Sequence, residues 1–208
     1  MAKSSLVESA AGVVMAVDRI VAGARKHFLA HGFRAVTMAD LASELGMSKK
    51  TLYEHFASKQ VLVEAVIAAK FAQAERQLAD VAGDVGLDFS ARLHALLRCI
   101  RLQAEEIQPS FLRDIARETP ELFEFVKKER RSLIHRHFGS LLKEGRAAGM
   151  IRKDVPERMM IEFLGGVTDA IVNPSMLGEL GLTPKTAFNQ ILTLFLMGAT
   201  TDKGRRQL

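Results

Sequence analysis

The sequence predicts an all-α protein with two parts, an N-terminal three-helix domain containing a helix-turn-helix and a larger C-terminal helical domain. Two observations predict this class. Apolar residues recur at helical spacing along most of the chain, and the alternation typical of strands is absent. The breaks between apolar runs carry glycine, or a polar residue followed by proline, which are typical of helix ends and helix starts.

The composition is compatible with an all-α protein and indicates the cellular compartment in which the protein is expected. Of 208 residues, 48% are hydrophobic and 25% are charged, so the chain can bury a core. The formal net charge of +5 permits a polyanionic partner without requiring one. The single cysteine, Cys99, makes neither an intramolecular disulfide nor a structural zinc site, which favours a reducing cytoplasm. The apolar stretch 191–199 is far shorter than the roughly 20 residues that span a bilayer, so no membrane partner is expected.

The first expected helix contains Ile20, Ala24 and Phe28, which recur at every fourth position. Gly32 follows, where a helix end favours a residue that tolerates positive φ. Residues 1–17 precede this pattern. We expect them to form an irregular extension, with an added helical turn or a DNA-tracking arm as alternatives.

Three further helices are expected before residue 82. Thr37 lies three residues before Asp40, a variant capping box that opens a short helix ending at Gly46. Ser48 can cap a third helix that ends near residue 56, and Ser58 can cap a fourth that extends towards residue 81. Short helices cannot bury enough surface alone, so residues 37–56 need the first helix as a third wall. The arrangement predicts a helix-turn-helix.

The expected third helix has two different faces. At 100° per residue, Leu52 and Phe56 face the small core, whereas Lys50, Thr51 and Glu54 face outward. A helix of this kind suits the major groove, with donors on both flanks for the phosphate walls. The alternative to a DNA-binding face is an ordinary solvated helix surface. The outward carboxylate of Glu54 counts against DNA binding, because phosphate repels it.

This division assigns roles to the candidate DNA-binding residues. Lys50 and Thr51 are expected to contact base edges. The expected phosphate contacts are Lys49, Tyr53, His55, Thr37, Ser48 and Lys59, the last at a helix start where the dipole favours anions.

The motifs 28–32, Thr37-Met38-Ala39-Asp40-Leu41-Ala42 and Leu45-Gly46-Met47-Ser48-Lys49-Lys50-Thr51-Leu52-Tyr53-Glu54-His55-Phe56-Ala57-Ser58-Lys59 resemble the TetR (tetracycline-repressor-like) family of regulators. The resemblance covers about residues 14–74. It implies that Lys49, Tyr53, His55 and Lys59 contact phosphate, and that Lys50 and Thr51 vary with the operator. It also implies a DNA-binding domain at 14–74, a ligand-binding and dimerisation domain at 75–201, and a function as a ligand-responsive transcriptional regulator.

The C-terminal part is expected to contain helices near 88–107, 109–117, 120–147, 156–173 and 184–199, with a frayed end at 202–208. Its aromatic and Met residues are mostly typical of a core, but the resemblance implies a cavity for an unidentified, apolar small-molecule effector. The candidate pocket residues are Leu96, Ile100, Phe111, Phe123 and Phe163.

The last two expected helices are apolar nearly all round, which requires two partners for each helix. A two-fold four-helix interface between two copies supplies the second partner and gives the two half-sites that a palindromic operator needs. The candidate interface residues are Phe163, Gly166, Val167, Ile191, Leu194, Phe195 and Gly198.

The sequence therefore predicts a homodimeric DNA-binding regulator, a repressor that a small molecule releases from double-stranded operator DNA. An activator of the same fold and a helical dimeric adaptor without specific DNA binding are the alternatives. An enzyme is not expected, because the histidines show no acid-base or metal spacing and no nucleophile–base pair is visible. No catalytic residue, metal or cofactor is predicted.

Overall fold

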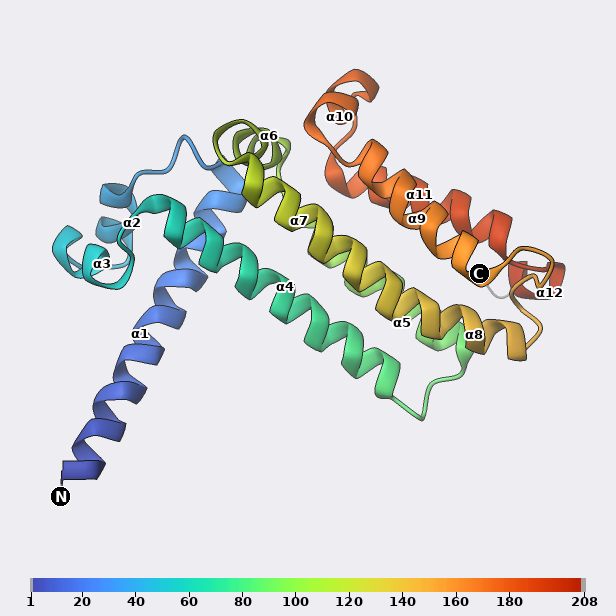
Figure 1. Ribbon diagram of the computed structural model, residues 1–208, viewed down its shortest axis with the longest axis horizontal. Coiled ribbons are helices and arrows are strands. Elements are labelled where there is room, and N and C mark those ends of the chain that lie inside the picture. Colours follow the sequence, from blue (N-terminus) through green and yellow to red (C-terminus); the bar gives the residue numbers. More distant parts are fainter. Residues whose placement is uncertain (1, 207–208) are drawn as a thin grey trace. The chain divides into compact units, whose positions relative to one another are not determined.

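The computed structural model describes residues 2–206, with side chains from Val14 onward. It divides into two compact units, the first extending to Lys70 and the second beginning at Phe71. The described residues form helices and one isolated β-bridge, between Ile151 and Thr200 (Figure 1). The all-α prediction is confirmed.

The first unit contains α1 (Ala2–His31), α2 (Met38–Glu44), α3 (Lys49–His55) and the beginning of α4 (Lys59–Gly83). Because α1 begins at Ala2, the expected irregular extension is instead helical. Its core joins all four helices through buried apolar side chains, among them Ile20, Phe28, Leu41, Leu52 and Leu62. Gly32 at φ 90° and Gly46 at φ 65° provide the left-handed turns after α1 and α2.

The second unit contains the remainder of α4 and the helices that follow it. These are α5 (Phe89–Glu105), α6 (Pro109–Glu118), α7 (Pro120–Leu133), the π-helical turn η1 (Ile134–Phe138), α8 (Gly139–Ala147), α9 (Glu157–Ile171), α10 (Pro174–Leu180), α11 (Pro184–Ala199) and α12 (Asp202–Arg205). The predicted boundary at residue 74 falls inside α4, a few residues beyond the division between the units.

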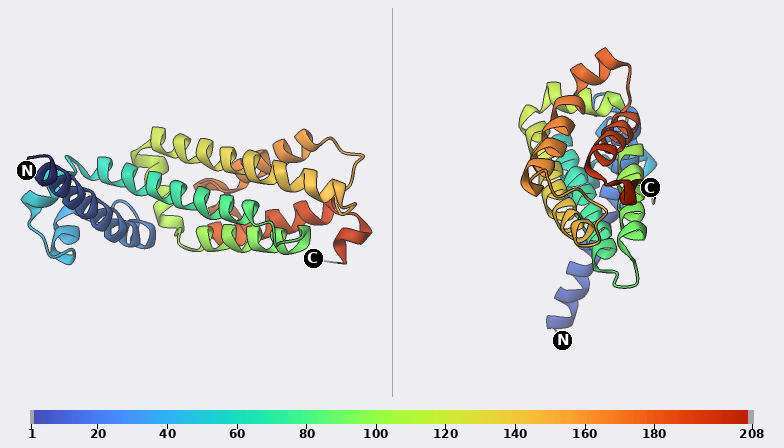
Figure 2. Two further views of the ribbon diagram at one scale, coloured as in Figure 1. Left: turned by 90° about the horizontal axis from the view of Figure 1, so that it is seen from below. Right: turned by 90° about the vertical axis from the view of Figure 1, so that its right-hand side faces the viewer.

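Helix α11 packs against both α5 and α9 in the second unit (Figure 2). Thr183 caps its start, accepting a hydrogen bond from the backbone N–H of Thr186, and Pro184 occupies its first turn. Helix α6 packs on α7 and α10, and α8 packs on α5 and α9. The core lies between these helices, with Leu96, Ile115 and Leu164 almost fully buried.

The C-terminal end is tied to the turn after α8. The N–H of Thr201 donates to the carbonyl of Met150 at 2.9 Å, and the N–H of Arg152 donates to the carbonyl of Ala199 at 2.9 Å. Thr201 then caps α12, so residues 202–205 are helical where fraying was expected. None of the helices in the described range is long and apolar enough to cross a membrane.

Candidate DNA interface

Helix α3 is fixed along one side and exposed along the other. Ser48 caps it, accepting a hydrogen bond from the N–H of Thr51 at 3.0 Å. Leu52 is fully buried and Phe56 is 5% exposed, which orients the helix against the unit's core. Lys49, Lys50 and Glu54 are therefore exposed on the surface.

The flanks of α3 combine donors of different kinds. Tyr53 is 49% exposed. His55, in the last turn, is half-buried. The hydroxyls of Ser48 and Thr51 share a hydrogen bond of 2.9 Å, so each already has a partner within the cap. Two lysines and a phenol thus lie on a short, exposed helix, an arrangement that can meet phosphate and base edges.

Thr37 caps α2 in a reciprocal arrangement with Asp40. The N–H of Asp40 donates to Thr37 Oγ1 at 3.1 Å, and Thr37 Oγ1 and N donate to Asp40 Oδ2 at 2.6 and 3.2 Å. These hydrogen bonds, with a smaller contribution from Lys49, hold the pKa of the Asp40 carboxyl below its ordinary value. The capping box predicted from sequence is present.

The ammonium group of Lys59, predicted from the sequence to contact phosphate, is bound to backbone carbonyls of its own unit. Its Nζ donates to the carbonyls of Phe33 at 2.8 Å and Val36 at 3.0 Å, and lies 4.4 Å from the centre of the Phe33 ring. The segment between α1 and α2 turns its carbonyls towards the start of α4, and these attract the cation. Lys59 therefore stabilises this segment, and the predicted phosphate contact is withdrawn.

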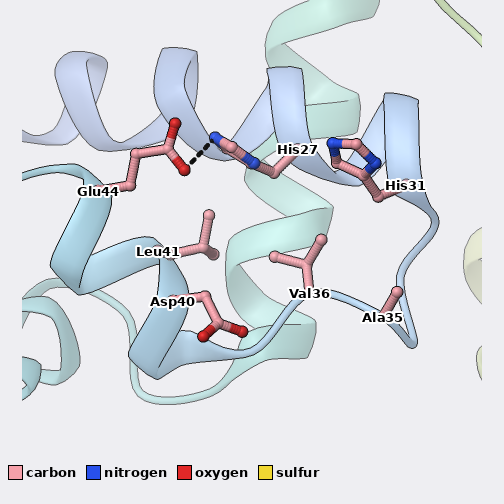
Figure 3. A pocket seen from close by; sticks show the side chains of 7 residues that line it. All are labelled: His27, His31, Ala35, Val36, Asp40, Leu41 and Glu44. Atoms are coloured by element: carbon pink, nitrogen blue, oxygen red, sulfur yellow. Dashed lines mark ion pairs between the residues drawn. The ribbon is translucent and has the colours of Figure 1, made fainter.

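A small cleft opens between α1 and α2 (Figure 3). His27 and His31 line one side, carboxylates of Asp40 and Glu44 line the other, and Leu41 lies between them. His27 Nε2 is 2.9 Å from Glu44 Oε2. This contact ties the first helix to the second, and so helps to set the orientation of the helix-turn-helix.

The sequence prediction overlooked that His27 and His31 share a helix face through their spacing of four residues, and that their rings stack at 6.0 Å. Among the side chains described, from residue 14 to residue 206, however, no three His, Cys, Asp or Glu are arranged to hold a metal ion.

The candidate pocket residues of the second unit do not all lie together in its interior. Leu96 and Phe111 are buried, and Ile100 and Phe123 are half-buried. Phe163 is 58% exposed on α9, because the opposite face of that helix packs inward through Leu164. Its prediction as a pocket wall was wrong for this protomer.

Helices α9 and α11 share an exposed apolar surface. Phe163 and Leu194 belong to it, Leu194 being 72% exposed, together with the exposed Gly166 and Gly198 and the half-buried Val167. Met159 and Met197 are also exposed, at 62% and 59%, and the sequence prediction missed both. The signal was available, since Met159 lies four residues before Phe163 and Met197 lies three residues after Leu194. We define these seven residues as the α9–α11 surface.

Two predicted interface residues lie elsewhere. Ile191 is 7% exposed and Phe195 is 5% exposed. The Phe195 ring meets Phe138 edge-on, with centroids 6.2 Å apart. Both side chains belong to the core of the protomer, because α11 is covered on that side by its own chain.

Comparison with known proteins agrees with the geometry of the first unit. Residues 20–66 match the family model of bacterial regulatory proteins of the tetR family. An uncharacterised helix-turn-helix-type transcriptional regulator of Bacillus subtilis, YvaF, is 25% identical over 189 residues, which cover 86% of this chain and 96% of that protein.

Solved structures share the fold over most of this chain. A TetR-family transcriptional regulator from Agrobacterium tumefaciens aligns with a TM-score of 0.66 at 21% identity, over 91% of this chain and 100% of that one. SmeT, the repressor of the SmeDEF multidrug efflux pump of Stenotrophomonas maltophilia, aligns with a TM-score of 0.60 at 16% identity, over 89% and 91% of the two chains. At these identities the likeness establishes the fold.

Proposed function

Because this chain is a transcriptional regulator of the TetR family, we propose that it is a repressor: it binds a palindromic operator as a homodimer and is released by a small apolar effector. The observation that carries the DNA-binding part is the exposed face of α3. Lys49 and Lys50 are exposed there, while Leu52 on the other side is fully buried. A rigid helix with cations facing outward suits the major groove.

The proposed contacts divide by chemistry. Lys50 and Thr51 contact base edges and determine preference, whereas Lys49, Tyr53 and His55 contact phosphates and determine affinity. Thr37 and Ser48 lie at the starts of α2 and α3, where the helix dipole favours phosphate, and they contribute chiefly by capping these helices. Lys59 has no part in this set, since its ammonium group is bound within the unit.

The α9–α11 surface supports the homodimer. Exposed Met, Phe and Leu side chains cluster there on two adjacent helices, and the exposed Gly166 and Gly198 allow the backbone of a second copy to approach. A dimer formed through this surface contains two α3 helices, one from each copy, as the two half-sites of a palindromic operator require.

Release by an effector requires coupling between the units, and α4 is the element that belongs to both. We propose that an apolar ligand packs near Leu96, Ile100, Phe111 and Phe123 more favourably in one position of α4 than in another. For a 100-fold change in operator affinity, the free energy of ligand binding must differ by about 2.7 kcal/mol between the two positions of α4. Burial of about 100 Å² of additional apolar surface in one state supplies it.

The decisive experiment measures binding to DNA upstream of the chain's own gene, by gel shift at two salt concentrations. Lys50→Ala and Thr51→Ala should relax base preference by about 1–3 kcal/mol per lost contact. Lys49→Ala should weaken all sequences alike and reduce the salt slope by about one.

Lys128→Ala removes the same charge from an exposed position on α7 and is the control. It should change neither the base preference nor the salt slope of DNA binding. Equal affinity for all DNA in every variant would favour the adaptor instead. Transcription assays in a deletion strain distinguish a repressor from an activator.

A further inference from the structure

Helices α7 and α8 form one continuous helix (Figure 1), which contains a π-helical turn at Ile134–Phe138. Leu133 and Gly139, on either side, keep α-helical backbone angles, so the turn widens the helix without ending it. Turns of this kind are uncommon and often coincide with functional positions, because they redirect side chains within a continuous helix. The contacts of the redirected side chains indicate what this turn does.

Two consecutive residues of the turn meet a single carboxylate of α4. Arg136 Nη1 is 3.0 Å from Glu75 Oε1, and His137 Nε2 is 3.2 Å from Glu75 Oε2. His137 is 7% exposed, so the histidine side of this contact is buried. Neighbouring side chains of an α-helix point about 100° apart. Their convergence on both oxygens of one carboxylate fixes the turn against α4.

The neighbouring residues of the same turn meet the helices of the α9–α11 surface. His135 Nε2 lies 3.6 Å from Glu162 Oε1 on α9. The ring of Phe138 packs edge-on against Phe195 on α11. Four consecutive side chains therefore reach α9, α4 and α11.

We propose that this π-turn couples the position of α4 to that of the α9–α11 pair. A shift of α11 moves Phe138, and because Arg136 and His137 lie in the same turn, the shift also reaches Glu75. Coupling between distant sites requires such an element in contact with both, one that has two discrete arrangements. In this proposal the second arrangement is the same helix with a regular α-turn in place of the π-turn of this structure. The significance of this coupling for operator release rests on the function proposed above.

Amide hydrogen exchange of the full chain, without DNA, tests the coupling. Phe195→Leu loosens the contact with Phe138, and we expect it to speed exchange across residues 71–83 of α4 at least about fivefold. In a Glu75→Gln background, which keeps the side-chain shape and removes the charge, the same substitution should change exchange there less than about twofold. If Phe195→Leu does not fold, His135→Ala replaces it, because it removes the turn's contact with Glu162 and leaves the ion pair between Arg131 and Glu162 in place.

Glu124→Gln is the matched control background, since its carboxylate pairs with Lys127 3.0 Å away within α7 and lies outside the turn. There, Phe195→Leu should have its full effect on α4. Equal effects in all three backgrounds, or none in any, would overturn the proposal. Operator binding is measured separately, so a wild-type chain that binds no operator would count against the proposed function while the exchange data still decide the coupling.

Discussion

Lys59 shows at the scale of one residue how a charged side chain can stabilise a turn. Its ammonium group satisfies the carbonyls of Phe33 and Val36. Lys59→Met keeps the stem and removes both donors, and an acceptor left without a partner costs about 1–3 kcal/mol. We expect the first unit to unfold at lower denaturant, while the salt slope of DNA binding stays unchanged. If Lys59→Met instead reduced the salt slope and left the stability unchanged, the result would support the phosphate contact that the sequence predicted.

Gly145 marks a position where no side chain fits. A Cβ atom there would lie 2.5 Å from Ile151 Cγ1 and 2.6 Å from the Phe89 ring, neither of which can move freely in the core. Gly145→Ala should destabilise the second unit by about 1–3 kcal/mol through overpacking. Gly178 in α10 has open space around its position, so Gly178→Ala should be neutral or stabilise by up to about 1 kcal/mol. Chemical denaturation of both variants checks the contrast.

Individual contacts were the hardest features to predict. The outward Lys50 and Glu54 followed from helical periodicity, because Leu52 and Phe56 define the buried side. Thr51, predicted on the same outward face, is half-buried. The inward ammonium group of Lys59 depends on where the backbone carbonyls of a distant turn point, and residue types do not encode that direction.

The cap of α2 gives a pH dependence at the scale of one element. The pKa of Asp40 lies below its ordinary value of 3.8, chiefly because Thr37 donates to the carboxylate. A lowered pKa in the folded state stabilises the cap above the unfolded pKa and loses that effect as the pH falls through the folded value. The cap should therefore weaken only below about pH 4. An NMR titration should show that Thr37→Val raises the Asp40 pKa towards 3.8; an unchanged value would contradict the assigned cause.

Helix boundaries were predicted well where capping chemistry is local. The Thr183-Pro184 pair located the start of α11, and Pro120 located the start of α7. The same signal at Asn173-Pro174 was overlooked, although Asn173 caps α10. The π-turn within the expected 120–147 helix has no residue-type signature that the sequence prediction could use, and its side chains contact α4, α9 and α11.

At the scale of the whole molecule, one largely buried ion pair, between Arg130 of α7 and Asp169, holds α9 against its own chain. Arg130 is buried and donates to Asp169 Oδ1 at 2.7 Å and more weakly to the carbonyl of Val172 at 3.4 Å. Burial lowers the pKa of Arg130, and the contact with Asp169 opposes that effect. One face of α9 is thus fixed by its own protomer, which leaves the opposite apolar face for a partner. Periodicity alone could not separate the two faces, since both are apolar.

Leu194 and Phe195 are adjacent in sequence and should respond oppositely to the same charge. Leu194 is 72% exposed on the α9–α11 surface, whereas Phe195 is 5% exposed inside the protomer. Leu194→Glu should leave the fold intact and dissociate the proposed dimer, because an unpaired charge in an apolar interface costs several kcal/mol. Phe195→Glu should instead unfold the second unit, because the same charge is then buried in the core. Sedimentation and circular dichroism separate the two outcomes, and operator affinity should collapse with the dimer in Leu194→Glu. If the wild-type chain sediments as a monomer at micromolar concentration, the proposed interface is wrong, because a monomer carries one α3 helix and cannot bind two half-sites at once.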